Sequence, residues 1–277
     1  MDSHIHLFPF DLFGGGGTAV GVQLLADAVR EMIEDNEEET KPTRALAYQG
    51  RVELHEETFE TMEAYQAWRT TARRAIQEVW SDGDFLFWVT GNHLGALPIY
   101  DELATAYPDT LVVQFDAHLD VYDLSDCTSE LSHGNFLLHS ESKLPPIVNL
   151  GHRELLLPQA HTSRYFTNAF PADQLCIDPK PAIETLKQLA QSASRIVIDL
   201  DCDVFDAAFF PAIAHPQPFG MSPSDLLRLL DAVWSDKVVG LAISEFHTAH
   251  DVNDRSLALL VWLLEYTLLR IYEKERG

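Results

Sequence analysis

The stretch RIVIDLDCDVFD, Arg195–Asp206, joins an apolar strand pattern directly to a group of carboxylates. Its first half, RIVIDL, is rich in β-branched and apolar residues, which is typical of a strand buried on both faces. Its second half places Asp201 and Asp203 where that strand ends. Strands of this kind belong to parallel sheets covered by helices, and such sheets bind their ligands at the carboxyl ends of the strands. The stretch therefore predicts both the fold class and the position of the site.

The same pattern of an apolar run followed by polar side chains recurs along the chain. The runs are Asp84–Val89 before TGNH, Thr110–Phe115 before DAHLD, and Val238–Ile243 before SEFH. Ala45–Val52 and Pro146–Leu150 also resemble strands, and helical patterns cover Glu57–Trp80, Leu94–Tyr107, a segment after the N-cap Ser222, and Asp254–Glu273. This alternation predicts an α/β protein, a three-layer α/β/α sandwich with a mostly parallel central sheet. We expect residues 1–277 to form a single domain.

The chain is strongly acidic, and this charge limits the kinds of partner that it can bind. Its 277 residues include 43 Asp and Glu but only 19 Lys and Arg, a net charge of −24. That charge repels nucleic acids and anionic membranes, and it attracts cations. The longest apolar run, Leu257–Leu264, is too short to span a bilayer. Three scattered cysteines and an N-terminus without a signal-peptide pattern favour a soluble protein of the reducing cytoplasm.

Metal-ligand side chains are concentrated at the predicted strand ends. Alternate residues of an extended segment point the same way, so Asp116, His118 and Asp120 converge, as do Asp201 and Asp203. Carboxylates gathered in this way repel one another unless cations lie between them. A lone DxD is usually a solvated loop, but the combination at successive strand ends favours a pair of metal ions. Oxygen donors with a few imidazoles suit Mn²⁺.

These motifs, in this order, resemble the ureohydrolase family of arginases, agmatinases and formiminoglutamases. The matching segments are TGNH (90–93), DAHLD (116–120), SHGN (132–135), DCDVFD (201–206) and EFHTAHD (245–251). The stretch from Asp203 to Pro211 also resembles the family's DxDxxDPxxxP pattern, except that Ala207 stands where the first proline would be. This alignment indicates Asp201 and Asp203, rather than Asp199 and Asp201, as the metal pair. The resemblance covers roughly residues 14–270, and DAHLD is its most specific piece.

The resemblance implies two Mn²⁺ ions per chain and a set of site residues. One ion would be held by His93, Asp116, Asp120 and Asp201, and the other by Asp116, His118, Asp201 and Asp203. A metal-bridging hydroxide would attack the guanidinium carbon, with Asp120 orienting it through a hydrogen bond. Glu245 would pair with the guanidinium, His133 would pass a proton to the leaving amine, and Asn135 would help to bind the substrate. The products would be urea and an amine. Many members form trimers or hexamers, so the resemblance also admits a homo-oligomer.

The sequence departs from the family at positions that bear on the substrate. Thr90 and Asn92 alter the first motif around His93, and His247 and Thr248 replace the Asn-Pro that usually follows the last Glu. After DAHLD the chain reads VYDLSDCTSELS, whose carboxylates would repel a free α-carboxylate. Arginine within a peptide, converted to ornithine as by peptide arginases on a ribosomal precursor peptide, is therefore the preferred substrate. Free arginine, agmatine or another free guanidino compound is the alternative.

Two other functions are weighed against a ureohydrolase. A non-catalytic metal-binding scaffold would retain the fold, although the filled ligand positions argue against it. The N-terminal DSHIH resembles the HxH metal pair of amidohydrolase barrels, but surface or N-terminal packing is the preferred interpretation of His4 and His6. His215 receives the same structural interpretation, and His152 and Arg153 are expected to shape a loop.

Overall fold

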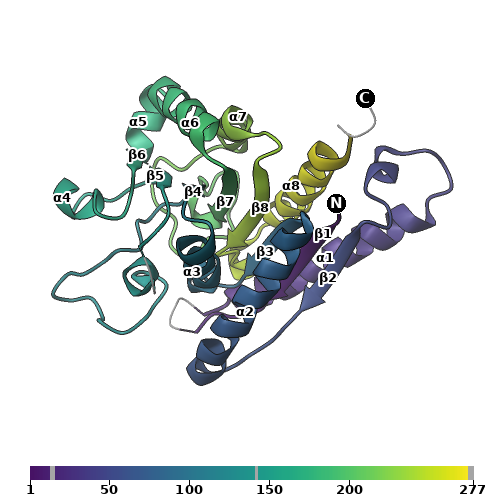
Figure 1. Cartoon of the computed structure of the whole chain (residues 1–277), viewed down its shortest axis with the longest axis horizontal. Helices are drawn as coiled ribbons and strands as arrows, with labels where there is room; N and C mark the ends of the chain where they lie inside the picture. The colour runs from purple at the N-terminus through teal and green to yellow at the C-terminus, as the bar shows by residue number, and fades with distance from the viewer. Residues whose placement is uncertain (13–15, 141–142, 274–277) are drawn as a thin grey trace.

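A parallel sheet runs through the middle of the molecule (Figure 1). The computed structural model describes residues 1–12, 16–140 and 143–273. Within them the sheet has eight strands in the order β2-β1-β3-β8-β7-β4-β5-β6, and every pairing is parallel. The strands are β1 (Ser3–Phe8), β2 (Val52–Glu56), β3 (Phe85–Thr90), β4 (Thr110–Phe115), β5 (Ile147–His152), β6 (Asn168–Pro171), β7 (Arg195–Asp201) and β8 (Val238–Ser244).

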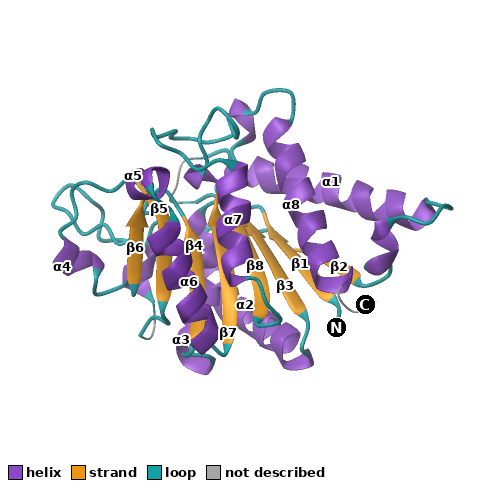
Figure 2. Cartoon of the chain, turned by 90° about the horizontal axis from the view of Figure 1, so that it is seen from above, coloured by secondary structure: helices purple, strands orange, loops and turns teal. Residues whose placement is uncertain are grey.

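Helices cover both faces of this sheet, as Figure 2 shows from above. The helices are α1 (Thr18–Glu38), α2 (Met62–Asp82), α3 (Leu97–Ala106), α4 (Gln159–Thr162), α5 (Ala172–Ile177), α6 (Lys180–Ser192), α7 (Pro223–Val233) and α8 (Arg255–Tyr272). Buried side chains of α1, α6, α7 and α8 form one hydrophobic core with the sheet, and those of α2 and α3 form another. The predicted three-layer α/β/α sandwich is confirmed, with a sheet that is wholly rather than mostly parallel.

The central strands show why the sequence adopts this architecture. All six residues of β3 and of β4 are buried, as their apolar composition predicts. Successive side chains of a strand point to opposite faces. Accordingly Leu111 and Val113 belong to the core that includes α1, α6, α7 and α8, whereas Val112 belongs to the core that includes α2 and α3. β3 and β4 thus each contribute to both cores.

Most predicted elements are found within a few residues, but some are corrected. The strand predicted at Ala45–Val52 is wrong, because a 3₁₀ turn and a loop occupy that segment and β2 begins at Val52. The helix predicted from Glu57 begins only at Met62, where Thr61 accepts a hydrogen bond from the Ala64 amide as N-cap. The N-cap predicted at Ser222 is confirmed by the same contact with Asp225 N.

The N-terminal strand β1 is absent from the sequence-based prediction. His4 and His6 alternate with Ile5 and Leu7, and the strand lies between β2 and β3 in the sheet. The DSHIH segment therefore lies in a strand of an open sheet, and the (β/α)₈ barrel required by the amidohydrolase interpretation is excluded. Among the described helices, none combines the length and apolarity needed to cross a membrane.

Candidate active site

The polar side chains predicted at the strand ends come from four neighbouring strands. In the sheet, β3, β8, β7 and β4 lie next to one another and run parallel. His93 follows β3, Asp116 follows β4, Asp201 ends β7, and Glu245 follows β8. Because parallel neighbours end at the same edge, residues that are up to 152 positions apart in sequence meet there.

A first cluster surrounds the buried ring of His93. Its Nδ1 atom lies 2.9 Å from Asp120 Oδ2, 3.1 Å from Asp201 Oδ2 and 3.3 Å from Asp116 Oδ2. These are the four residues that the resemblance assigned to one metal ion. The structure brings all four together, and three carboxylates converge on one imidazole nitrogen.

A second cluster forms beside the first and shares Asp116 with it. His118 Nδ1 lies 2.8 Å from Asp203 Oδ2 and 3.8 Å from Asp116 Oδ1. Ligand atoms of Asp116, His118 and Asp203 all lie within 4.8 Å of one another. The backbone around them is held by Arg153, whose guanidinium donates to the carbonyls of Asp203 and Val204, so the expectation that Arg153 shapes a loop is confirmed.

The electrostatics of the two clusters fit a pair of cations. Burial, together with the charge of Asp120, raises the pKa of Asp116 to about 7, and burial with the charge of Asp203 raises that of Asp201. Buried Nδ1 of His93 and Oδ2 of Asp116 are 3.3 Å apart, and neither has a partner in hydrogen-bonding geometry among the described residues. Divalent cations among these oxygen and nitrogen donors would remove the repulsion and satisfy the orphaned atoms. The donor set therefore fits a binuclear metal site.

Two residues without a role predicted from the sequence, Asp199 and Tyr100, orient His93 from the Nε2 side of its ring, opposite the first cluster. Asp199 Oδ2 accepts hydrogen bonds from His93 Nε2 at 2.9 Å and from the Tyr100 hydroxyl at 2.5 Å. A carboxylate on the far nitrogen fixes the tautomer of a metal-binding imidazole. Asp199 lies two residues before Asp201 on the same strand, and this spacing was the available signal. Tyr100 carried none in the sequence.

The altered first motif supports the backbone rather than the His93 ring. Asn92 Nδ2 donates to Leu12 O at 2.8 Å, and the Thr90 hydroxyl donates to Asn92 O at 2.9 Å. Both side chains are buried. The substitutions in TGNH therefore leave the orientation of His93 to Asp199.

Glu245 lies between the first cluster and His133. Its Oε1 accepts from the His93 amide at 3.0 Å and lies 3.2 Å from His133 Nδ1. Burial lowers the pKa of His133, but the hydrogen bond and charge of Glu245 outweigh it and raise that pKa. Glu245 and Asp120 have φ angles of 60° and 49°, in the left-handed region that non-glycine residues rarely adopt. Such strained backbone is common where a structure holds a functional group in place.

The clusters open into a cavity of about 670 Å³, a volume that includes the solvent at its mouth. Its lining residues are His118, Asp120, Tyr122, His133, Gly134, Asp201, Asp203, Ala214, His215 and Glu245. His215, interpreted from the sequence as structural, thus faces the site. Asn135 is not among these residues: its amide donates to Thr128 O and Glu130 O and accepts from Ser132 N. These hydrogen bonds join Asn135 to residues 128–132 of its own loop. The assignment of Asn135 to substrate binding stays a prediction.

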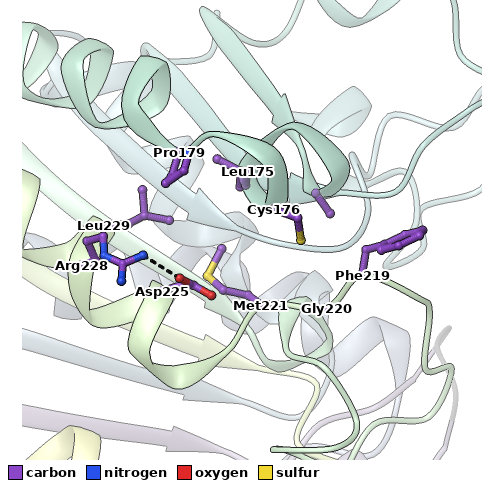
Figure 3. A pocket seen from close by; sticks show the side chains of 11 residues that line it. Leu175, Cys176, Pro179, Phe219, Gly220, Met221, Asp225, Arg228 and Leu229 are labelled. Atoms are coloured by element: carbon purple, nitrogen blue, oxygen red, sulfur yellow. Dashed lines mark hydrogen bonds and ion pairs between the residues drawn. The ribbon is translucent and has the colours of Figure 1, made fainter.

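A second cavity, shown in Figure 3, differs in character. It lies between α5, α7 and the segment around Phe219, and its lining is mostly apolar. Its two charged side chains, Asp225 and Arg228, pair with each other at 2.9 Å. Such a pocket offers no convergent polar groups, so the strand-end cavity is the candidate active site.

Comparisons with known proteins identify the family and the fold of this chain. The family model described as Arginase family matches residues 2–269. Arginase 1, mitochondrial, of Arabidopsis thaliana is 28% identical over 159 residues, 54% of this chain and 43% of that protein. N(1)-aminopropylagmatine ureohydrolase of Thermus thermophilus is 28% identical over 165 residues, 59% and 55% of the two chains. The matched region thus spans about half the length of these relatives. The crystal structure of arginase from Bacillus subtilis shares the fold, with a TM-score of 0.80, 18% identity and coverage of 97% and 98%.

Proposed function

This chain belongs to the arginase family, and we propose that it is a metal-dependent ureohydrolase that releases urea from a guanidino compound. The observation that carries the proposal is the convergence of six ligand side chains on two adjoining positions at the strand ends. We assign two Mn²⁺ ions, one to His93, Asp116, Asp120 and Asp201, and the other to Asp116, His118, Asp201 and Asp203. When bound, such ions supply the Lewis acidity that lowers the pKa of a water molecule.

Glu245 is the residue that we assign to the guanidinium. Within the described residues, both side-chain hydrogen bonds of Glu245 use Oε1, which leaves Oε2 to accept from a guanidinium N–H. A planar guanidinium pairs favourably with a carboxylate. The side chain is buried against the His93 backbone, so it would place the substrate carbon beside the first cluster.

His133 is the residue that we assign to proton transfer. It lines the cavity, its side chain is 38% exposed, and its Nδ1 contacts Glu245. The contact with Glu245 raises the pKa of His133 and so favours its protonated form, which is the form that donates a proton to a leaving amine. Asp120, 2.9 Å from His93 Nδ1, would accept a hydrogen bond from the attacking water.

The mouth of the site supports arginine within a peptide as the substrate, with ornithine in the peptide as the product. Tyr122, His133 and Gly134 line both the active-site cavity and an open groove that continues along the 127–135 loop. Asp123 and Asp126, just before this loop, and Glu130 within it are exposed. A free α-carboxylate would be repelled by them, whereas a peptide bond carries no charge there. A ribosomal precursor peptide would provide such a substrate.

The test compares substrates that differ only around the α-carbon. Urea release is measured with Mn²⁺ for free L-arginine, agmatine and an arginine-containing peptide, and mass spectrometry detects conversion of peptide arginine to ornithine. We expect kcat/KM to be highest for the peptide and activity to be lost in Asp116→Asn. A preference for free arginine or agmatine would refute the peptide assignment, and absence of urea from all three would refute the ureohydrolase.

A further inference from the structure

A second group of metal-ligand side chains lies on the edge strand β2 and its neighbour β1, apart from the strand ends that carry the active site. His4 lies opposite Glu53 in the parallel register, and His55 follows Glu53 by two residues. Because alternate residues share a face, all three side chains project from the same side of the sheet. His4 is near the amino-terminal end of β1, whereas the active site lies at the carboxyl ends of its strands.

The three ligand atoms are spaced as a metal ion requires. His4 Nδ1 lies 3.2 Å from His55 Nε2 and 3.6 Å from Glu53 Oε2, and the latter two atoms are 3.7 Å apart. Bonds of about 2.0–2.2 Å in tetrahedral geometry place neighbouring ligand atoms roughly 3.4 Å from one another. All three observed distances between ligand atoms lie close to this value.

Asp84 holds His4 in the tautomer that a metal needs. Asp84 Oδ2 accepts from His4 Nε2 at 3.3 Å, and its other oxygen accepts from the Asp2 amide at 2.6 Å. With the proton on Nε2, the lone pair of Nδ1 faces His55 and Glu53. This arrangement of carboxylate, histidine and open lone pair is the usual support of a metal-binding imidazole.

The surroundings keep the second imidazole in place. The ring of His55 stacks on His6 at 4.5 Å and on His4 at 5.5 Å. The side chains of His55 and Glu53 are 43% and 62% exposed, so an ion and its water ligands can reach them. Burial and the neighbouring His4 lower the pKa of His55, and the charge of Glu53 opposes this shift.

We propose that His4, Glu53 and His55 form a mononuclear site for a borderline transition metal, with Zn²⁺ as the ion of best fit and water completing its coordination. Two imidazoles and one carboxylate are typical zinc donors, whereas the oxygen-rich clusters of the active site suit Mn²⁺. The ion would join β1 to the edge strand β2, and so stabilise the margin of the sheet.

The experiment measures zinc content at equilibrium. The full chain, saturated with Mn²⁺, is dialysed against micromolar free Zn²⁺, and bound metal is counted by mass spectrometry for the wild type, His55→Asn and Glu53→Gln. His250→Asn, which removes another exposed histidine, is the matched control. We expect His55→Asn to lose one Zn²⁺ per chain, Glu53→Gln to bind it at least tenfold more weakly, and His250→Asn to match the wild type.

A further variant tests the orientation of His4. Asp84→Asn is expected to weaken zinc binding about 10- to 100-fold without changing the number of ions at saturation. Urea release should be unaffected in all of these variants, and circular dichroism in EDTA verifies that each one folds. Equal zinc content in the wild type and His55→Asn would overturn the proposal, and would mean that His4 and His55 share only a hydrogen bond.

Discussion

Replacing Asp199 by Asn tests whether this residue orients a metal ligand or is one itself. The change keeps the shape of the side chain but removes its charge. In the structure Asp199 contacts His93 Nε2 and the Tyr100 hydroxyl, while the opposite nitrogen of His93 faces Asp116, Asp120 and Asp201. Asp199 therefore acts on the first cluster only through the His93 ring.

The size of the effect follows from that arrangement. The negative charge at 2.9 Å raises the basicity of His93 and fixes its tautomer, and loss of such a partner costs about 10- to 100-fold in metal affinity. This corresponds to about 1.4–2.7 kcal/mol of binding free energy. Tyr100→Phe, which removes a donor to Asp199 but leaves its charge, should have a smaller effect.

Calorimetric titration of the metal-free protein with Mn²⁺ provides the assay. Asp199→Asn should still bind two ions at saturation, with a weaker affinity for the position nearest His93. A drop to one ion per chain would show that Asp199 is itself a ligand. An unchanged affinity would show that His93 needs no orienting carboxylate, and either result would refute the reasoning.

Three further outcomes are expected from other parts of the molecule. Glu245→Gln should lower kcat/KM for the guanidino substrate about 10- to 100-fold in a urea assay, because the charged hydrogen bond to the guanidinium is lost. Gly21→Ala should lower the free energy of unfolding by roughly 1–3 kcal/mol in urea denaturation, because its Cβ would overlap the carbonyl oxygen of Phe246. Gly16→Ala is the control, because its Cβ would meet no atom of the described residues within 4 Å. Mn²⁺ at a hundredfold excess over Kd should stabilise the protein by about 2.7 kcal/mol per site relative to protein in EDTA, and Asp116→Asn should show little of this shift in thermal unfolding.

Strands buried on both faces were the elements that the sequence predicted well. RIVIDLD and TLVVQF form β7 and β4 as expected, because a short run rich in β-branched and apolar residues is typical of a strand covered on both faces. The edge strand β2 and its neighbour β1 were harder to find. β1 alternates histidine with apolar residues, and β2 is mostly exposed, so neither carries the pattern of a buried strand. Their pairing depends on contacts between residues about fifty positions apart.

By itself, the sequence determined that carboxylates and imidazoles follow apolar strands in the order of the arginase family, because strand burial and alternation are local properties of the chain. Only the tertiary structure decided which partners stand behind those side chains. Asp199 contacts both His93 and Tyr100, and His4 contacts His55. These contacts follow from the order of the strands and the packing of the helices, and no periodic pattern in the sequence predicts them. The physical reason is that the neighbours of a side chain across a sheet depend on how all the strands and helices pack into one core. The sequence of a single segment does not determine that packing.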